Sequence, residues 1–300
     1  MSVRTYIGAV LCAAALQTMV MPVPAFAGDL QQTVSADEPV APAGQLHEFR
    51  QGHADLGPLI VSGGDQAFDA FVRDDSQIPP IWRHTDDLLF VVGEQAAQQL
   101  PDSDEFAFTG AQPGQKVWVV PQVEQAGVPW LGWSTQSPAF VEQVDRGITM
   151  TFVGHSGPGQ FTLFLQNGGF EKPQVLWNSA EQRAQELWVD ANTHTHANWV
   201  FTEPGIHQVA IEIAAKLKDG SEDTITKILT FAVGEEADLP AAQAAQWDGT
   251  FYPAETEAQA PAVAQGIGSW VIPSLVAVVG AVVAIALVIS VRRRAGRKGH

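Results

Sequence analysis

The sequence predicts an all-β protein: an immunoglobulin-like β-sandwich ectodomain with an N-terminal signal peptide and one C-terminal transmembrane helix. Short runs of β-branched and aromatic residues, bounded by Gly, Pro, Asn or Asp, recur through the middle of the chain. Many short strands at this spacing are typical of a sandwich. Apolar runs at the two ends indicate export and membrane anchoring.

The N-terminal residues 1–27 are expected to form a Sec signal peptide. They contain one basic residue, Arg4, then an apolar run, and then small residues at Ala25 and Ala27 that form an A-x-A cleavage site. The only cysteine of the chain, Cys12, lies within this segment. The mature chain would therefore have neither disulfides nor thiolate metal ligands.

The C-terminal residues 270–291 are expected to form a transmembrane helix. Residues 271–291 carry no charge and are long enough to cross about 30 Å of hydrocarbon. The basic tail 292–300 predicts a cytoplasmic C-terminus by the positive-inside rule. We therefore expect a single-pass protein of the cell membrane whose N-terminal ectodomain lies outside the cell.

Composition divides the ectodomain into one folded domain and two linkers. Residues 28–45 and 235–269 are rich in Ala, Pro, Gln and acidic residues, lack an apolar period, and are expected to be a disordered linker and a disordered stalk. The β-sandwich is expected over 46–234. Residues 28–270 contain ten basic and 33 acidic residues, which gives a formal charge of −23. Such a charge repels nucleic acid and concentrates cations, and it also keeps an exported protein soluble.

The individual strands follow from their side chains and their boundaries. Six runs are predicted as strands: 69–74, 87–93, 116–122, 148–154, 159–166 and 174–179. Two longer runs, 207–217 and 224–233, flank "KDGSED" and predict a hairpin that turns at Asp219-Gly220. A short helix is expected over 94–101.

Two pairs of polar residues predict a metal site. His194 and His196 are two residues apart in "NTHTHANWVF", as are His53 and Asp55 in "GHADLG". Side chains two apart in a strand share a face, so each pair can aim at one point. Three imidazoles and a carboxylate suit tetrahedral Zn²⁺, or Mn²⁺ if water completes a larger shell. His155 is an additional candidate from a loop, and hydrogen-bonded structural histidines are the alternative.

The tryptophans favour a different function. Seven of them fall within residues 46–234, and sugar-binding sandwiches stack tryptophan on pyranose rings. Trp130 and Trp133, around a glycine in "PWLGW", are the candidate glycan platform. The alternation of other tryptophans with apolar residues, as in Trp118 and Val120, favours a place in the core, and a core position is also preferred to a platform for Trp130 and Trp133.

An enzymatic function is not expected. The sequence contains no G-x-S-x-G or H-E-x-x-H motif, and the mature chain has no cysteine nucleophile. Adjacent acids such as Asp74 and Asp75 face opposite sides of a strand, which makes them poor acid–base pairs.

Seven segments carry a resemblance to a known family: 52–58, 86–93, 116–122, 127–136, 157–164, 175–179 and 193–205. In these segments the chain resembles the actinobacterial surface-anchored protein domain, also called the choice-of-anchor M domain. The resemblance covers nearly the whole folded region. It implies a single-copy member with a membrane-helix anchor and no LPxTG signal, associated with ABC transporters of the metal-importing type. A role in metal capture follows, without catalytic activity.

The sequence therefore predicts a membrane-anchored surface protein that captures a divalent metal ion. The predicted ion is zinc, with Mn²⁺ as the alternative, and the predicted role is support of an ABC-type importer. The alternative function is a surface adhesion or cell-wall-glycan-binding module in which the histidines are structural. No nucleic-acid partner is expected.

Overall fold

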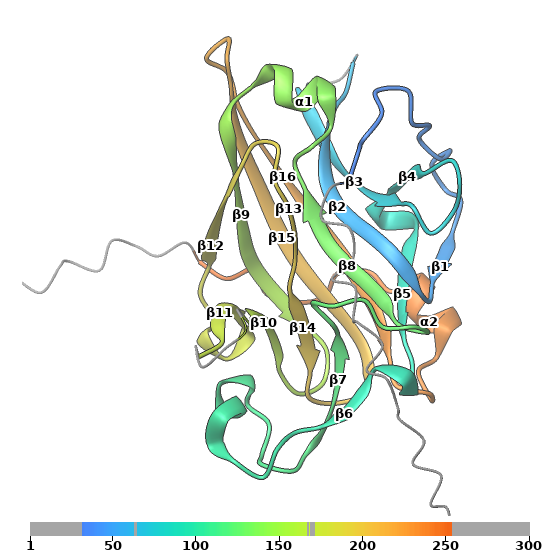
Figure 1. The fold of residues 1–300 in the computed structure, drawn as a ribbon, viewed down its shortest axis with the longest axis vertical. Helices are drawn as coiled ribbons and strands as arrows, with labels where there is room; N and C mark the ends of the chain where they lie inside the picture. The colour runs from blue at the N-terminus through green and yellow to red at the C-terminus, as the bar shows by residue number, and fades with distance from the viewer. Residues whose placement is uncertain (1–31, 63–64, 167, 169–171, 254–300) are drawn as a thin grey trace, which may run out of the picture. The chain divides into compact units, whose positions relative to one another are not determined.

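The computed structural model describes residues 32–62, 65–166, 168 and 172–253, and these residues form an all-β fold (Figure 1). Strands make up 48% and helices 12% of the structure, so the predicted class is confirmed. The arrangement is sandwich-like. It differs from an immunoglobulin-like domain because the described strands are divided among three sheets rather than two.

The largest sheet contains the two strands that pair over the greatest length among the described residues. Its order is β1 (His47–Phe49), β5 (Leu88–Val92), β16 (Glu222–Val233), β15 (Gly205–Leu217), β9 (Val144–Ser156) and β12 (Gln185–Asp190). The hairpin expected over 207–233 lies at its centre, because β15 pairs with β16 along almost its full length. At the turn Gly220 adopts a φ of +92°, and Asp219 Oδ1 accepts a hydrogen bond from the backbone N–H of Ser221.

A second sheet is antiparallel throughout. Its order is β11 (Gln174–Asn178), β10 (Phe161–Leu165), β14 (Asn198–Phe201), β7 (Lys116–Val120) and β6 (Ala97–Gln99). The helix expected over 94–101 is wrong. The segment forms a 3₁₀ turn, η2 (Glu94–Ala96), and then β6, because pairing of Ala97 with Trp118 outweighs the local helix preference.

The third sheet brings together strands that are far apart in the chain. Its order is β13 (His194–His196), β8 (Pro129–Ser134), β2 (Gly52–Ile60), β3 (Phe68–Asp74) and β4 (Ile81–His84). The parallel strands β2 and β8 lie side by side (Figure 1). The remaining short helices are η1 (Thr85–Asp87), η3 (Asp104–Thr109), α1 (Pro138–Gln143), η4 (Ser179–Glu181) and α2 (Leu239–Ala244).

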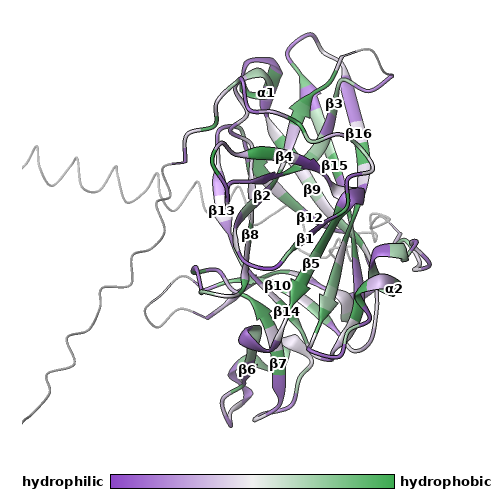
Figure 2. Ribbon diagram, turned by 90° about the vertical axis from the view of Figure 1, so that its right-hand side faces the viewer, coloured by the Kyte–Doolittle hydropathy of each residue, from purple (hydrophilic) through white to green (hydrophobic). Residues whose placement is uncertain are grey.

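One apolar core joins the three sheets. Leu131 from β8, Ile211 from β15 and Trp199 from β14 are fully buried members of it. In Figure 2 the interior strand β5 is green along its length, whereas turns at the surface are purple. Of the seven tryptophans in the expected domain, six are buried: Trp82, Trp118, Trp130, Trp133, Trp177 and Trp199. The core interpretation is therefore confirmed for these six.

The N-terminal linker expected over 28–45 is ordered where the structure describes it, from residue 32 onward. The backbone N–H of Ala41 donates to Trp82 O over 2.8 Å, and the N–H of Trp82 donates to Pro39 O over 2.9 Å. These bonds pair the segment with β4, the outer strand of the third sheet. Because they satisfy backbone groups that the edge of a sheet leaves unpaired, the segment lies against the domain.

The stalk expected over 235–269 also begins with ordered structure. Ala242 of α2 is buried against the largest sheet. Farther along, the backbone N–H of Tyr252 donates to Val153 O over 2.6 Å, and its ring packs against the core. The folded unit therefore extends past both expected bounds, because apolar side chains in low-hydropathy segments still find buried positions.

The other predicted segments lie outside the described residues. These are the signal peptide 1–27, the membrane helix 270–291 and the tail 292–300. Within the part of the chain that the structure describes, no helix has both the length and the apolar character to span a bilayer.

Candidate metal centre

Two strands of the third sheet carry the predicted ligands, and β8 lies between them. On one side β13 carries His194 and His196. On the other side β2 carries His53 and Asp55. In this register Gly132 of β8 stands directly between His196 and Asp55. Because residues two apart share a face, all four side chains project from the same face of the sheet.

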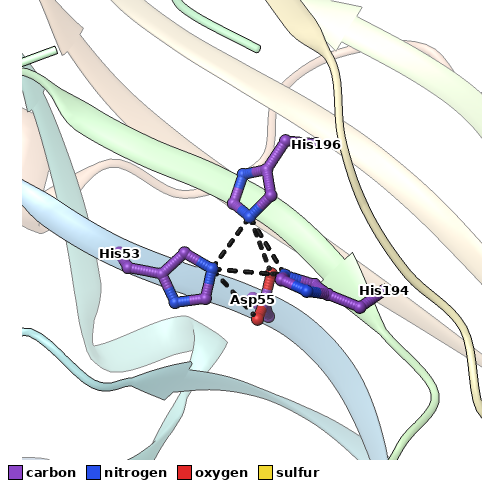
Figure 3. Close-up of side chains that lie close together, drawn as sticks. All are labelled: His53, Asp55, His194 and His196. Atoms are coloured by element: carbon purple, nitrogen blue, oxygen red, sulfur yellow. Dashed lines mark hydrogen bonds and ion pairs between the residues drawn. The ribbon is translucent and has the colours of Figure 1, made fainter. Parts of the chain in front are cut away.

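The four side chains converge (Figure 3). The Nε2 atom of His53 lies 2.8 Å from that of His196 and 3.2 Å from that of His194. The Nε2 atoms of His194 and His196 are 3.0 Å apart. A triangle of this size leaves a point about 2.0–2.1 Å from all three nitrogens, the usual Zn–N distance. With Asp55 included, one ligand atom per residue lies within 4.8 Å of every other, so the group could hold a metal ion.

Asp55 supplies the carboxylate and is fully buried, with 0% of its surface exposed. Its Oδ1 lies 3.0 Å from His194 Nε2, and its Oδ2 lies 3.5 Å from His53 Nε2. Oδ2 has no hydrogen-bond partner. A buried carboxylate oxygen without a partner is strongly unfavourable. A cation among the three imidazole nitrogens would satisfy it, so the residues present fit a metal.

Gly132 makes the space in which the side chains meet. A Cβ atom at this position would lie 2.7 Å from Asp55 Oδ1 and 2.8 Å from His196 Cε1. It would also lie 2.5 Å from the carbonyl oxygen of Thr195. Side chains from both neighbouring strands therefore lean over the glycine, and this close approach needs a residue without a side chain.

Trp130 forms a wall of the centre. Its ring stacks on His196 with 4.1 Å between centroids and lies 4.7 Å from the ring of His53. The indole N–H donates to Gln122 O over 3.0 Å. Trp130 and Trp133 are only 6% and 3% exposed. The alternative in which these two tryptophans form a glycan platform is contradicted, because both are buried, and the preferred core position holds.

Asp75 orients His53 from outside the centre. Its Oδ1 lies 2.7 Å from His53 Nδ1, so the ring N–H there donates to the carboxylate. This fixes the tautomer and leaves the Nε2 lone pair directed at the other ligands, an arrangement common in metal-binding histidines. Asp190 and Glu186 lie closer to His194 in the sequence and would be the nearest carboxylates for such a role. Asp190 instead accepts the indole N–H of Trp188.

The electrostatics of the centre favour an ionised carboxylate. Burial raises the pKa of Asp55. Its hydrogen bond with His194 and its interactions with the three imidazoles together lower the pKa by more than burial raises it, so the net pKa is below its ordinary value. Burial lowers the pKa of His53, whereas the hydrogen bond to Asp75 and the nearby carboxylates raise it, with a net increase. Burial is the main cause that lowers the pKa of His196 to about 3. The negative charge of Asp55 is therefore balanced either by a proton on a neighbouring imidazole or by a metal cation.

His155, the additional candidate, does not join the centre. Its Nε2 lies 3.0 Å from Nδ1 of His207, and the two rings stack. The Nε2–H of His207 donates to Glu203 O over 2.9 Å, which leaves Nδ1 as the acceptor for His155. Two imidazoles joined in this way form a structural pair.

We expect the His155–His207 pair to make the fold acid-sensitive. Burial lowers the pKa of His155 to about 3 and that of His207 to about 4. Unfolded histidine binds protons below about pH 6.5, so the unfolded state takes up more protons than the folded state as the pH falls from there to about 4. Stability present above pH 6.5 is lost by about 1.4 kcal/mol per pH unit for each such histidine.

The test is the free energy of unfolding in denaturant at pH 7 and pH 5. The His155→Gln variant should lose about 2 kcal/mol less than the wild type between these values. Equal losses in the two proteins would show that the pair does not set the acid response.

The chain matches no family model, no curated protein and no solved structure. The resemblance to the choice-of-anchor M domain therefore stays a prediction.

Two residues that build the centre are not predicted from the sequence. In the sequence Asp75 stands out only as half of an unsuitable acid pair, although it follows the strand predicted at 69–74. Gly132 stands out only as the glycine of "PWLGW", although a glycine within a strand signals close approach by another group.

Proposed function

We propose that this protein binds a single Zn²⁺ ion through His53, Asp55, His194 and His196. The observation that carries the proposal is the convergence of three Nε2 atoms beside the buried carboxylate of Asp55, whose Oδ2 lacks a hydrogen-bond partner. Three nitrogens and one oxygen are a common tetrahedral zinc donor set. Mn²⁺ prefers oxygen ligands and a larger shell with water, and the buried positions of Asp55 and His196 leave little access for water.

We also propose that the bound zinc is cargo captured at the cell surface in support of an ABC-type importer. The support comes from the predicted signal peptide and membrane helix and from what the family resemblance implies about transporter partners. The ectodomain charge of −23 would concentrate cations near the site. A non-enzymatic role fits the ligand set, because four protein ligands complete a tetrahedral shell and leave no open position for a substrate.

Metal analysis of the purified full-length protein tests the zinc proposal. After incubation with equal Zn²⁺ and Mn²⁺ and removal of free metal, we expect about one zinc per chain and little manganese. The Asp55→Asn variant should retain much less zinc, because it removes the anionic ligand. A wild-type protein free of both metals would contradict the proposal.

A structural zinc site is the second candidate, and the burial of the centre favours it. The side chains of His194 and His196 are each 2% exposed, whereas that of His53 is 16% exposed. A structural ion would exchange slowly and would leave cellular zinc uptake unchanged when the gene is deleted. A cargo ion would leave past His53, and deletion would reduce uptake when zinc is scarce. Chelator-exchange rates and uptake measurements therefore separate the two.

A further inference from the structure

We propose that Glu38 is a positioning residue of the metal centre, which acts on His53 through Arg73 and Asp75. The inference rests on the proposed function, since it concerns the affinity of the same site. It assigns a role to the segment 32–41, which lies outside the domain bounds that the sequence predicts.

A continuous chain of charged contacts leads from Glu38 to the centre. Arg73 donates to both carboxylate oxygens of Glu38, through Nε and Nη2, over 2.7 Å in each case. Its third donor, Nη1, reaches Asp75 Oδ2 over 2.6 Å. The other oxygen of Asp75 holds His53 Nδ1. Both oxygens of each carboxylate in this chain of contacts are therefore engaged by a neighbouring residue. The bidentate pair between Arg73 and Glu38 has a fixed geometry.

Burial distinguishes this relay from an ordinary surface ion pair. The side chains of Arg73 and Glu38 are 3% and 6% exposed. Removal of one partner from a buried pair leaves the other charge uncompensated, so the remaining group moves to find a new partner. Surface pairs, in contrast, contribute little when broken.

The register of β2 and β3 shows where Arg73 would move. Arg73 stands directly opposite Asp55 on the neighbouring strand, and directly opposite side chains have Cβ atoms about 4.5–5.5 Å apart. Asp55 Oδ2 has no hydrogen-bond partner. Glu38 occupies two of the donors of Arg73 and keeps them away from this oxygen. Without Glu38, the guanidinium would compete with the metal for Asp55 and would weaken the hold of Asp75 on His53.

Backbone bonds hold Glu38 in place for this role. The residue that follows it, Pro39, accepts the N–H of Trp82, and Ala41 donates to the carbonyl of the same residue. The neighbouring side chain of Gln32 also reaches Asp75 Oδ2, at 3.4 Å. The N-terminal segment is therefore attached to β4 and to the relay at separate points, which makes it part of the centre.

Zinc affinities of full-length variants, measured by competition with a chromophoric chelator, test the inference. Asp75→Asn should bind zinc about tenfold more weakly than the wild type, as is usual when the partner of a ligating histidine is lost. Glu38→Gln should bind roughly fivefold more weakly, because it acts two links further out. The matched control is Asp69→Asn. Asp69 lies on β3, the same strand as Arg73, and its substitution breaks a 2.7 Å ion pair with Lys227 but touches no member of the relay.

Two further measurements separate positioning from loss of fold. The melting temperatures of the metal-free proteins show whether Glu38→Gln and the control are equally stable. The ligand-field absorption of bound Co²⁺ should differ from wild type in Glu38→Gln and Asp75→Asn but not in Asp69→Asn, because only the first two alter the ligand geometry.

The outcomes are distinct. If the wild type binds no zinc, the proposed function itself fails. If the wild type binds zinc, and Glu38→Gln matches its affinity and its Co²⁺ spectrum, the positioning role of Glu38 is overturned and the metal site stands. If Glu38→Gln does not fold, Asp75→Asn decides, because an unchanged affinity there removes the last link of the relay.

Discussion

Zn²⁺ should raise the melting temperature of the wild-type protein at pH 7.5 and leave that of the His194→Ala/His196→Ala variant unchanged. A ligand that binds only the folded state stabilises it by about 2.7 kcal/mol at 100 times its dissociation constant. For a folded unit of this size, that corresponds to a rise of about 5–10 °C. The double variant removes two of the three nitrogens that lie within 3.2 Å of one another, so no metal site remains.

The matched control is His47→Ala/His84→Ala, which removes two histidines from outside the ligand group and should retain the shift. At pH 5.5 the wild-type shift should shrink, because imidazole binds metal only when neutral and the pKa of His53 lies above its ordinary value of about 6.5. A chelator should reverse the shift. A wild-type melting curve that responds to neither Zn²⁺ nor Mn²⁺ would show that the three imidazoles are structural.

The Gly132→Ala substitution should strongly weaken zinc binding although it changes no ligand. The added Cβ would lie 2.5–2.8 Å from Thr195 O, Asp55 Oδ1 and His196 Cε1, closer than atoms of these kinds approach. Backbone or ligands must move, so we expect zinc affinity to fall by about 100-fold. The free energy of unfolding should fall by about 1–3 kcal/mol, as for other overpacked sites.

Gly93→Ala provides the control for this substitution. Gly93 has an ordinary negative φ, and a Cβ there would approach only the flexible end of Gln95, at 3.2 Å. Its zinc affinity should equal that of the wild type. Isothermal titration with Zn²⁺ and denaturant unfolding measure both quantities, and undiminished affinity in Gly132→Ala would mean that the side chains do not meet over the glycine.

The sequence by itself determined the features that depend on neighbouring residues. The face-sharing of His194 with His196, and of His53 with Asp55, follows from the period of two along any strand. The turn at Gly220 follows from residues adjacent to it, and the β class follows from the abundance of short β-branched and aromatic runs. These predictions were confirmed because the physical causes are local.

Contacts between distant segments were decided by the tertiary structure alone. Placement of β2 and β13 on either side of β8 brings residues 53 and 194 together, and no local preference encodes that strand order. The same order buries Trp130 against His196 and requires a glycine at 132. The ordered N-terminal segment was missed for the same reason: its composition resembles a linker, and only the partners that Glu38 finds in the folded chain show its place in the centre.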